Sequence, residues 1–248
     1  GAFGIFIAEP RGSVYLDPVT RCETNTGNQV IISNPLLGEF REFVLLMHDG
    51  VRLLDKNDHL IIDPEPLLIE PDEELVDFED QGSRGFNYRS ERFKNRLKDV
   101  NDISKVFSSR VHGDPSTPIF EAYAGDRVTV RFVFPADRAR AHAFVMHGHR
   151  WNRSTEDVNS LPVSVQGQNS VGSRGNFRLE YGAGGFLEKP GDYMYRSGNI
   201  RWDIELGMWG IMRVLDEKSE CLAPLKKVIK VKEDYYEQCS SESDSSSE

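Results

Sequence analysis

The sequence is short of cysteine, of basic charge and of long hydrophobic runs, and each shortage excludes a class of protein. No apolar run approaches the roughly 20 residues that a membrane-spanning helix needs. The formal net charge of −10 argues against a general nucleic-acid-binding protein, which needs a basic surface. Cys22, Cys221 and Cys239 have no metal-binding spacing, and three cysteines allow at most one internal disulfide.

The first residues of the chain do not read as a secretory leader. Residues 1–8 read as a strand, do not begin with methionine and contain no basic residue. We therefore expect the chain to be processed or truncated, and to begin inside a larger structure.

Acidic residues are concentrated in two segments. Residues 63–80 contain nine acids and no base, and the tail that ends at Glu248 is rich in acids and serine. Segments of this composition bury too little apolar surface to offset the entropy lost on ordering. We expect both to be solvated and partly disordered. The tail is expected to act as a solubilising segment, with phosphate acceptance on its serines as the alternative.

Short strand-like segments separated by turn signals dominate the sequence. Residues 127–134 alternate polar and apolar side chains, and Ala124-Gly125-Asp126 before them is typical of a tight turn. Other strands are expected at residues 29–33, 41–48, 59–63, 142–147, 176–181, 191–196 and 209–215. The one short helix is expected at residues 90–97, with Ser90 as its N-cap. This pattern predicts an all-β protein, a β-sandwich with Greek-key connections.

We divide the chain into four parts: strands belonging to a preceding domain, an acidic connector with the short helix, a complete sandwich, and a C-terminal extension. They span residues 1–65, 66–109, 110–216 and 217–248. The first part is suggested by an internal similarity. Its opening residues and the residues from Gly207 both read glycine, bulky, aromatic, glycine, isoleucine, and then a strand.

Three of the six histidines lie within eight residues, at the end of a predicted strand. These are His142, His147 and His149. On a strand, His147 and His149 would point to the same side of the sheet, because side chains alternate. That is one of the few local ways for a β protein to present two imidazoles to one metal ion. Ordinary strand-edge or loop histidines are the alternative.

Together with other segments of the chain, these histidines make the sequence resemble the multicopper oxidases, which are built from cupredoxin domains. Residues 117–131 resemble the strand, turn and strand that open such a domain. Residues 142–149 are similar to the family's His-Pro-x-His-x-His-Gly-His segment, and residues 190–195 with Gly207-Met-Trp-Gly210 resemble its closing section. Two further segments are similar to large, multi-domain bacterial-type oxidases, namely residues 1–10 and 86–90.

The resemblance implies copper as the cofactor. In the family, two histidines and a cysteine thiolate hold a mononuclear blue copper, often with an axial methionine, and further histidines hold a trinuclear cluster that reduces dioxygen. The family pattern places a mononuclear-copper histidine on His142, a trinuclear-cluster histidine on His147 and the axial methionine on Met208. His149 takes the last histidine of the segment, which is not usually a direct ligand. The candidate metal ligands are therefore His142, His147, His149 and Met208.

The sequence also departs from the family pattern. The second histidine of the first segment falls on Val145, which cannot bind copper. The family's His-Cys-His falls on Ser197-Gly198-Asn199, and its next histidine falls on Asp203. A pairing of Arg201 with Asp203 is expected to fill this space in place of copper. A hard cation such as Mn or Ca on Asp203 and Glu205 is the alternative, because such cations favour oxygen ligands.

A further candidate ligand pair lies at the end of an earlier strand, at His48 and Asp49. The alternative interpretation is a strand-end histidine whose hydrogen bonds are satisfied within the fold.

Two functions from different classes follow from the resemblance. In the first, the chain is a fragment or subunit of a multicopper-oxidase-like protein and is mainly structural, with a degenerate copper site. Its expected partners are other cupredoxin domains or chains of the same oxidase. In the second, it is a non-enzymatic cupredoxin-like scaffold or interaction module that has lost copper. A third class, an extracellular cation-binding protein, would explain the acidic segments alone. Oxidoreductase activity and export from the cell follow from the resemblance only.

Overall fold

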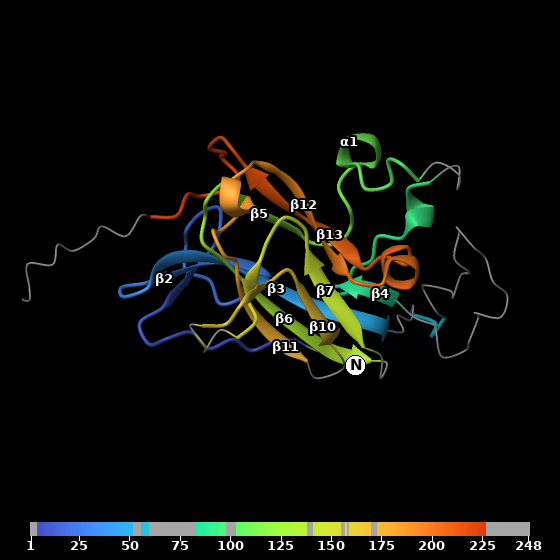
Figure 1. The fold of residues 1–248 in the computed structure, drawn as a ribbon, viewed down its shortest axis with the longest axis horizontal. Coiled ribbons are helices and arrows are strands. Elements are labelled where there is room, and N and C mark those ends of the chain that lie inside the picture. Colours follow the sequence, from blue (N-terminus) through green and yellow to red (C-terminus); the bar gives the residue numbers. More distant parts are fainter. Residues whose placement is uncertain are drawn as a thin grey trace, which may run out of the picture.

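The computed structural model of the chain, shown in Figure 1, confirms the predicted all-β class. It describes residues 4–51, 56–59, 83–97, 103–137, 141–154, 157, 159–169 and 173–226. Within these residues, no helix is long and apolar enough to cross a membrane. Residues 63–80, the acidic tail and Cys239 lie outside the described part, while Cys22 and Cys221 are exposed free thiols.

Two sheets pack face to face. The larger sheet has the strand order β1 (Val14–Leu16), β2 (Gln29–Asn34), β3 (Gly38–Val51), β6 (Val128–Asp137) and β11 (Arg174–Arg178), with β4 (Ser83–Phe86) also paired to β3. The second sheet has the order β10 (Val165–Asn169), β7 (His142–Met146), β12 (Gly191–Ser197), β13 (Trp209–Leu215) and β5 (Ile119–Tyr123). The short strands β8 (Trp151–Asn152) and β9 (Pro162–Val163) form a separate hairpin.

The chain passes back and forth between the two sheets. Strands β5, β6 and β7 belong alternately to the second, the first and the second sheet, and β10, β11 and β12 repeat this order. These crossings leave two parallel pairings, β3 with β6 and β5 with β13, among otherwise antiparallel strands. Non-sequential neighbours of this kind are typical of a Greek-key sandwich.

The core lies between the sheets and follows directly from side-chain alternation. In β6, Val128, Val130 and Phe132 point inward and are buried, as the period of two along a strand requires. Aromatic rings fill much of the space: Phe43 stacks on Phe120 at 4.7 Å between ring centroids, and Trp151 stacks on the buried ring of Phe177 at 4.9 Å. This burial of large apolar side chains holds the two sheets together.

The first part of the chain belongs to the same sandwich. Strand β3 pairs with β6 along most of its length, from Arg41 opposite Val128 to Asp49 opposite Asp137. The expected division near residues 65 and 110 therefore does not coincide with a division between sheets. Residues 4–8, within the predicted first strand, form no strand in the structure.

The short helix predicted at residues 90–97 is wrong. Only the 3-10 turn η3 (Phe93–Asn95) forms there, and Ser90 does not cap it. The hydroxyl of Ser90 donates to the carbonyl of Leu206 instead, and the N–H of Phe93 donates to the carbonyl of Glu205. Tertiary hydrogen bonds to the turn before β13 therefore take the groups that a helix would use. The described helical elements include α1 (Ser109–His112), η4 (Gly185–Leu187) and the π-turn η5 (Ile200–Ile204).

Candidate functional site

His142, the first residue of β7, is buried between two carboxylates. Its Nδ1 lies 2.7 Å from Oδ2 of Asp203, and its Nε2 lies 2.9 Å from Oδ2 of Asp49. Ionised carboxylates only accept hydrogen bonds, so both ring nitrogens donate and the ring carries a positive charge. Burial lowers the pKa of His142, but the hydrogen bonds and charges of Asp203 and Asp49 outweigh it and raise the pKa to about 9.

Arg84 closes the arrangement from strand β4. Its Nε lies 2.9 Å from Oδ1 of Asp49, and its Nη1 lies 3.5 Å from Oδ1 of Asp203. The hydroxyl of Ser197 also donates to Oδ2 of Asp203. We name Asp49, Arg84, His142 and Asp203 the His142 cluster. It contains two positive and two negative groups, so its charge is balanced without any added ion.

The His142 cluster ties together one end of the sandwich. Asp49 lies near the end of β3, Arg84 lies on β4 beside it, and His142 begins β7. Asp203 comes from η5, whose last turn is held by a 2.7 Å hydrogen bond from the N–H of Met208 to the carbonyl of Asp203. Strand β4 and the orange η5 turn lie at the same end of the molecule in Figure 1. The cluster therefore links strands of both sheets.

These residues do not fit a blue-copper ion. The resemblance places copper ligands on His142 and Asp203, but both ring nitrogens of His142 are already bound to carboxylates. At Gly198, where the family has its cysteine, an added Cβ would lie 2.5 Å from Cβ of Ala143, which is closer than real Cβ contacts allow. Met208 is buried within the hydrophobic core. The position therefore lacks both a thiolate and the space to hold one.

Asp203 forms an ion pair with Arg84, and its expected pairing with Arg201 stays a prediction. The side chain of Arg201 lies outside the described part of the chain. Among the described residues, no group of three or more His, Cys, Asp or Glu side chains has the geometry to hold a metal ion. A hard cation on Asp203 and Glu205 thus stays an untested alternative.

The expectation that His147 and His149 point the same way is wrong. Strand β7 ends at Met146, and Gly148 adopts a φ of +71°, which turns the chain between the two histidines. His147 is exposed and its Nε2 accepts a 2.8 Å hydrogen bond from Nε of Arg196. Burial and the charge of Arg196 lower the pKa of His147. The two imidazoles consequently cannot act as a pair on one face of a strand.

His149 is buried and both of its ring nitrogens have backbone partners. Its Nδ1 lies 2.8 Å from the carbonyl of His147 and donates to it, while Nε2 accepts from the N–H of Gly184 at 3.0 Å. Burial lowers the pKa of His149 and favours this neutral form. His149 therefore fastens the turn after β7 to the loop at Gly184. Its role as a metal ligand remains a prediction without support from this geometry.

The side chains of the candidate pair His48 and Asp49 have different partners. Asp49 joins the His142 cluster, whereas the ring of His48 stacks near Tyr88 at 6.1 Å between centroids. Burial lowers the pKa of His48 to about 4, so this histidine is neutral at physiological pH. Tyr88 and the preceding Asn87 both have positive φ, and the Asn87 amide bonds backbone groups of Val44 and Leu46. Asn87 thereby fixes β4 against β3 and places Arg84 beside Asp49.

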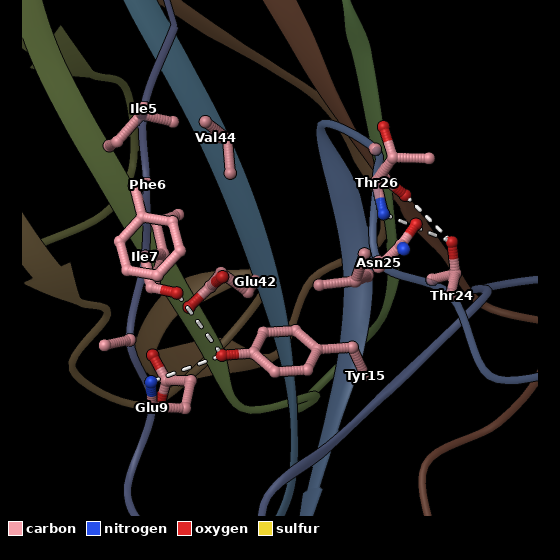
Figure 2. A pocket seen from close by; sticks show the side chains of 13 residues that line it. Ile5, Phe6, Ile7, Glu9, Tyr15, Thr24, Asn25, Thr26, Glu42 and Val44 are labelled. Carbon is pink, nitrogen blue, oxygen red and sulfur yellow. Dashed lines mark hydrogen bonds between the residues drawn. The ribbon is translucent and has the colours of Figure 1, made fainter.

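A second candidate site is a groove of about 510 Å³ on the outer side of β2 and β3, shown in Figure 2. Residues 5–9 run along it, and the hydroxyl of Tyr15 accepts from the N–H of Glu9 at 3.2 Å. Arg131 bridges the carboxylates of Glu9 and Glu42, the latter at 2.7 Å. Burial raises the pKa of Glu42 to about 7, with Arg131 opposing the rise and Glu9 adding to it.

Comparisons with known proteins give structural likeness only. No family model and no curated protein matches the sequence. A crystal structure of a multicopper oxidase is 14% identical with a TM-score of 0.40, and the match covers 70% of this chain and 44% of that one. The multicopper oxidase mgLAC is 15% identical, with a TM-score of 0.36 and coverage of 72% and 39%. The copper nitrite reductase of Nitrosomonas europaea is 12% identical, with a TM-score of 0.34 and coverage of 71% and 42%.

Two of these three structures are multicopper oxidases, the family that the sequence resembles. The chain spans less than half the length of each solved structure. Likeness at this level carries no residue role over to the chain, so its chemistry has to be argued from its own side chains.

Proposed function

We propose that this chain is a copper-free, cupredoxin-like sandwich that serves as a structural component of a multicopper-oxidase-like protein. Other cupredoxin domains or chains of that protein would be its partners and would hold the copper. The observation that carries the proposal is the His142 cluster. It occupies, with four balanced charges, the position where the resemblance expects a mononuclear copper.

The chemistry of the cluster supports a structural role. Copper binds imidazole through a free ring nitrogen, and a blue-copper site also needs a thiolate. His142 offers no free ring nitrogen, and Gly198 leaves no room for a thiolate side chain. Inserting copper would require His142 to lose a carboxylate partner, and breaking one contact of a buried, charge-balanced cluster is costly. The cluster instead holds β3, β4, β7 and η5 together.

Copper binding to the isolated chain tests this proposal. The full chain is incubated with Cu(II) and separately with Cu(I), desalted, and analysed for bound copper and for its visible spectrum. We expect no intense thiolate-to-copper band in the visible spectrum. We also expect the amount of bound copper to be the same in wild type and in His142→Gln. The matched control is His147→Gln, because exposed His147 accounts for weak surface binding. An intense blue band, or stoichiometric copper lost only in His142→Gln, would overturn the proposal.

A second measurement separates the two classes of function. The tagged chain is recovered from its native source together with its bound partners, and dioxygen consumption is followed with a phenol or with Mn(II). Activity in the assembly but not in the isolated chain supports the oxidase component. Copper-free partners without oxidase activity would favour the alternative scaffold function. Unaided oxidation by the isolated chain would contradict both, and recovery from the cell interior would contradict the export that we propose with them.

A further inference from the structure

The first described segment, residues 4–9, lies extended across the outer face of the larger sheet. Ile5, Ile7 and Glu9 are half-buried, whereas the residues between them are exposed. This alternation puts the three side chains on one side of the segment, as in a strand. Figure 2 shows the segment alongside β3, with Glu42 beside it. The segment therefore covers part of the sheet without being one of its strands.

Side chains, rather than backbone hydrogen bonds, attach this segment to the sheet. In the described part of the chain, no backbone–backbone hydrogen bond joins residues 4–9 to a strand. The hydroxyl of Tyr15 accepts from the N–H of Glu9 at 3.2 Å and donates to the carbonyl of Ile7 at 3.5 Å. The carboxylate of Glu9, the one charged side chain of the segment, pairs with Arg131 of β6. Glu9 is therefore the main attachment point.

Arg131 also holds a second buried carboxylate. Its Nε lies 2.7 Å from Oε2 of Glu42 on β3, and the side chains of Glu9 and Glu42 are 4% and 2% exposed. We name Glu9, Glu42 and Arg131 the Glu42 cluster. With both carboxyl groups ionised, the cluster has two negative charges and one positive charge, unlike the balanced His142 cluster. A buried charge without a partner is costly, so the uptake of one proton stabilises this arrangement.

The other groups on this outer face do not supply the missing positive charge. From the neighbouring strands they are Tyr15 of β1, Val30 of β2, Arg127, just before β6, Thr129 of β6 and Arg178 of β11. Tyr15, Val30 and Thr129 carry no charge at neutral pH, and Arg127 donates to the carbonyl of Leu37 instead. Burial raises the pKa of Glu42 to about 7. The charge of Arg131 opposes this rise, while the charge of Glu9 and a hydrogen bond with it add to the rise.

Proton binding at Glu42 is consequently linked to the position of residues 4–9. When the segment is displaced, Glu42 becomes hydrated and its pKa moves back toward the ordinary value of 4.5. An acid whose pKa is higher in the closed arrangement favours closing at low pH, and this contribution is lost as the pH rises through about 7. Part of the burial of Glu42 remains without the segment. The equilibrium constant for closing should therefore fall by on the order of 10- to 100-fold.

We propose that the Glu42 cluster is a pH-sensitive switch, which holds residues 4–9 against the sheet while its two carboxyl groups share a proton and releases them when that proton is lost. Release removes Ile5 and Ile7 from the groove and uncovers its apolar wall, which includes Val30 and Val44. The outer face of β2 and β3 then presents an apolar surface above neutral pH that is covered below it. The proposal is independent of the function proposed above.

The mobility of the segment as a function of pH tests this proposal. The isoleucine methyl groups of the full chain are labelled with carbon-13, and methyl relaxation is measured in steps from about pH 5 to about pH 9. We expect the methyl groups of Ile5 and Ile7 to be ordered at the acidic end and to become mobile with a midpoint near pH 7. The buried residues Ile31 and Ile211, one from each sheet, should stay ordered and show that the sandwich remains folded.

Three glutamine variants identify the group that titrates. Glu42→Gln and Glu9→Gln each leave one carboxylate with the arginine, so either variant should abolish the transition near pH 7, and Glu42→Gln should keep the segment ordered throughout. Both variants retain every histidine, so a transition caused by a histidine would persist in them. The matched control is Glu121→Gln on β5 of the other sheet, which should leave the transition unchanged. Mobility that does not vary with pH in wild type, a transition that persists in Glu42→Gln or is lost in Glu121→Gln, or release only together with disorder at Ile31 and Ile211 would overturn the proposal.

Discussion

The two ends of the sandwich are each closed around a buried arginine, but in different ways. At one end Arg41 binds a single carboxylate, with its Nε 2.6 Å from Oδ2 of Asp126, and the carbonyl of Ala223. At the other end Arg84 shares two carboxylates with the positively charged His142. The difference is that the end where the resemblance expects copper gathers two carboxylates and His142 around one arginine. Its charges are balanced entirely by side chains.

The largest expected effect comes from removing an arginine at each end. Arg84→Met leaves Asp49 and Asp203 buried with only His142 to compensate them, so we expect a loss of about 3–5 kcal/mol in the free energy of unfolding. Arg41→Met is expected to lose less, because it leaves only Asp126, which is 12% exposed. Urea denaturation measures both, with exposed Arg110→Met as the control. If Arg41→Met lost as much free energy of unfolding as Arg84→Met, or more, the proposed difference between the two ends of the sandwich would be wrong.

The pH dependence of stability sharpens the comparison. The pKa of His142 is raised in the folded state to about 9. A raised pKa contributes stability that is fully present below the unfolded value of about 6.5 and is lost as pH rises through the folded value. We expect the difference in unfolding free energy between wild type and His142→Gln to shrink by on the order of 3 kcal/mol between pH 6.5 and pH 10. A difference that stays constant over this range would mean that His142 is neutral.

A smaller effect is expected from filling the space at Gly198. Gly198→Ala places a Cβ 2.5 Å from Cβ of Ala143, and overpacking of this kind costs about 1–3 kcal/mol. Ala143→Gly in the same chain removes the clashing atom and should recover most of the loss. Thermal and urea unfolding of the two single variants and the double variant measure the coupling. Additive effects would show that the position is roomier than the structure indicates.

The smallest expected effect is at Met208. If this side chain serves core packing, Met208→Leu conserves its volume and costs less than about 1.5 kcal/mol. Copper retained after desalting should be identical in wild type and variant. A selective loss of copper in Met208→Leu would indicate that Met208 is an axial copper ligand. It would contradict a purely structural role for the end of the sandwich that holds the His142 cluster.

Local patterns in the sequence predicted the elements whose formation depends on local chemistry. The alternation at residues 127–134 corresponds to β6, and the turn at Gly125, with a φ of +78°, lies where glycine indicates it. The strand expected at residues 176–181 forms at Arg174–Arg178, two residues earlier. His147 and His149 were misjudged because β7 ends at Met146, before both of them, and the chain turns at Gly148. Gly125 is followed by Asp126, a second turn-forming residue, whereas Gly148 stands alone between two histidines.

Only two of the four residues of the His142 cluster could be predicted from the sequence. His142 and Asp203 could be brought together through the family pattern, and they do lie in contact. Their further partners could not be predicted, because Asp49 is 93 residues from His142 and Arg84 is 119 residues from Asp203. No periodicity or spacing links such distant positions.

The sequence by itself determined the all-β class and the absence of a thiolate at residues 197–199, since alternation and residue identity are both local properties. Only the tertiary structure decided which side chains meet at His142. Four charged groups from β3, β4, β7 and η5 meet at one end of the sandwich, because the crossing of the chain between two sheets brings remote strand ends together. Burial then makes it costly for any of these charges to remain without a partner.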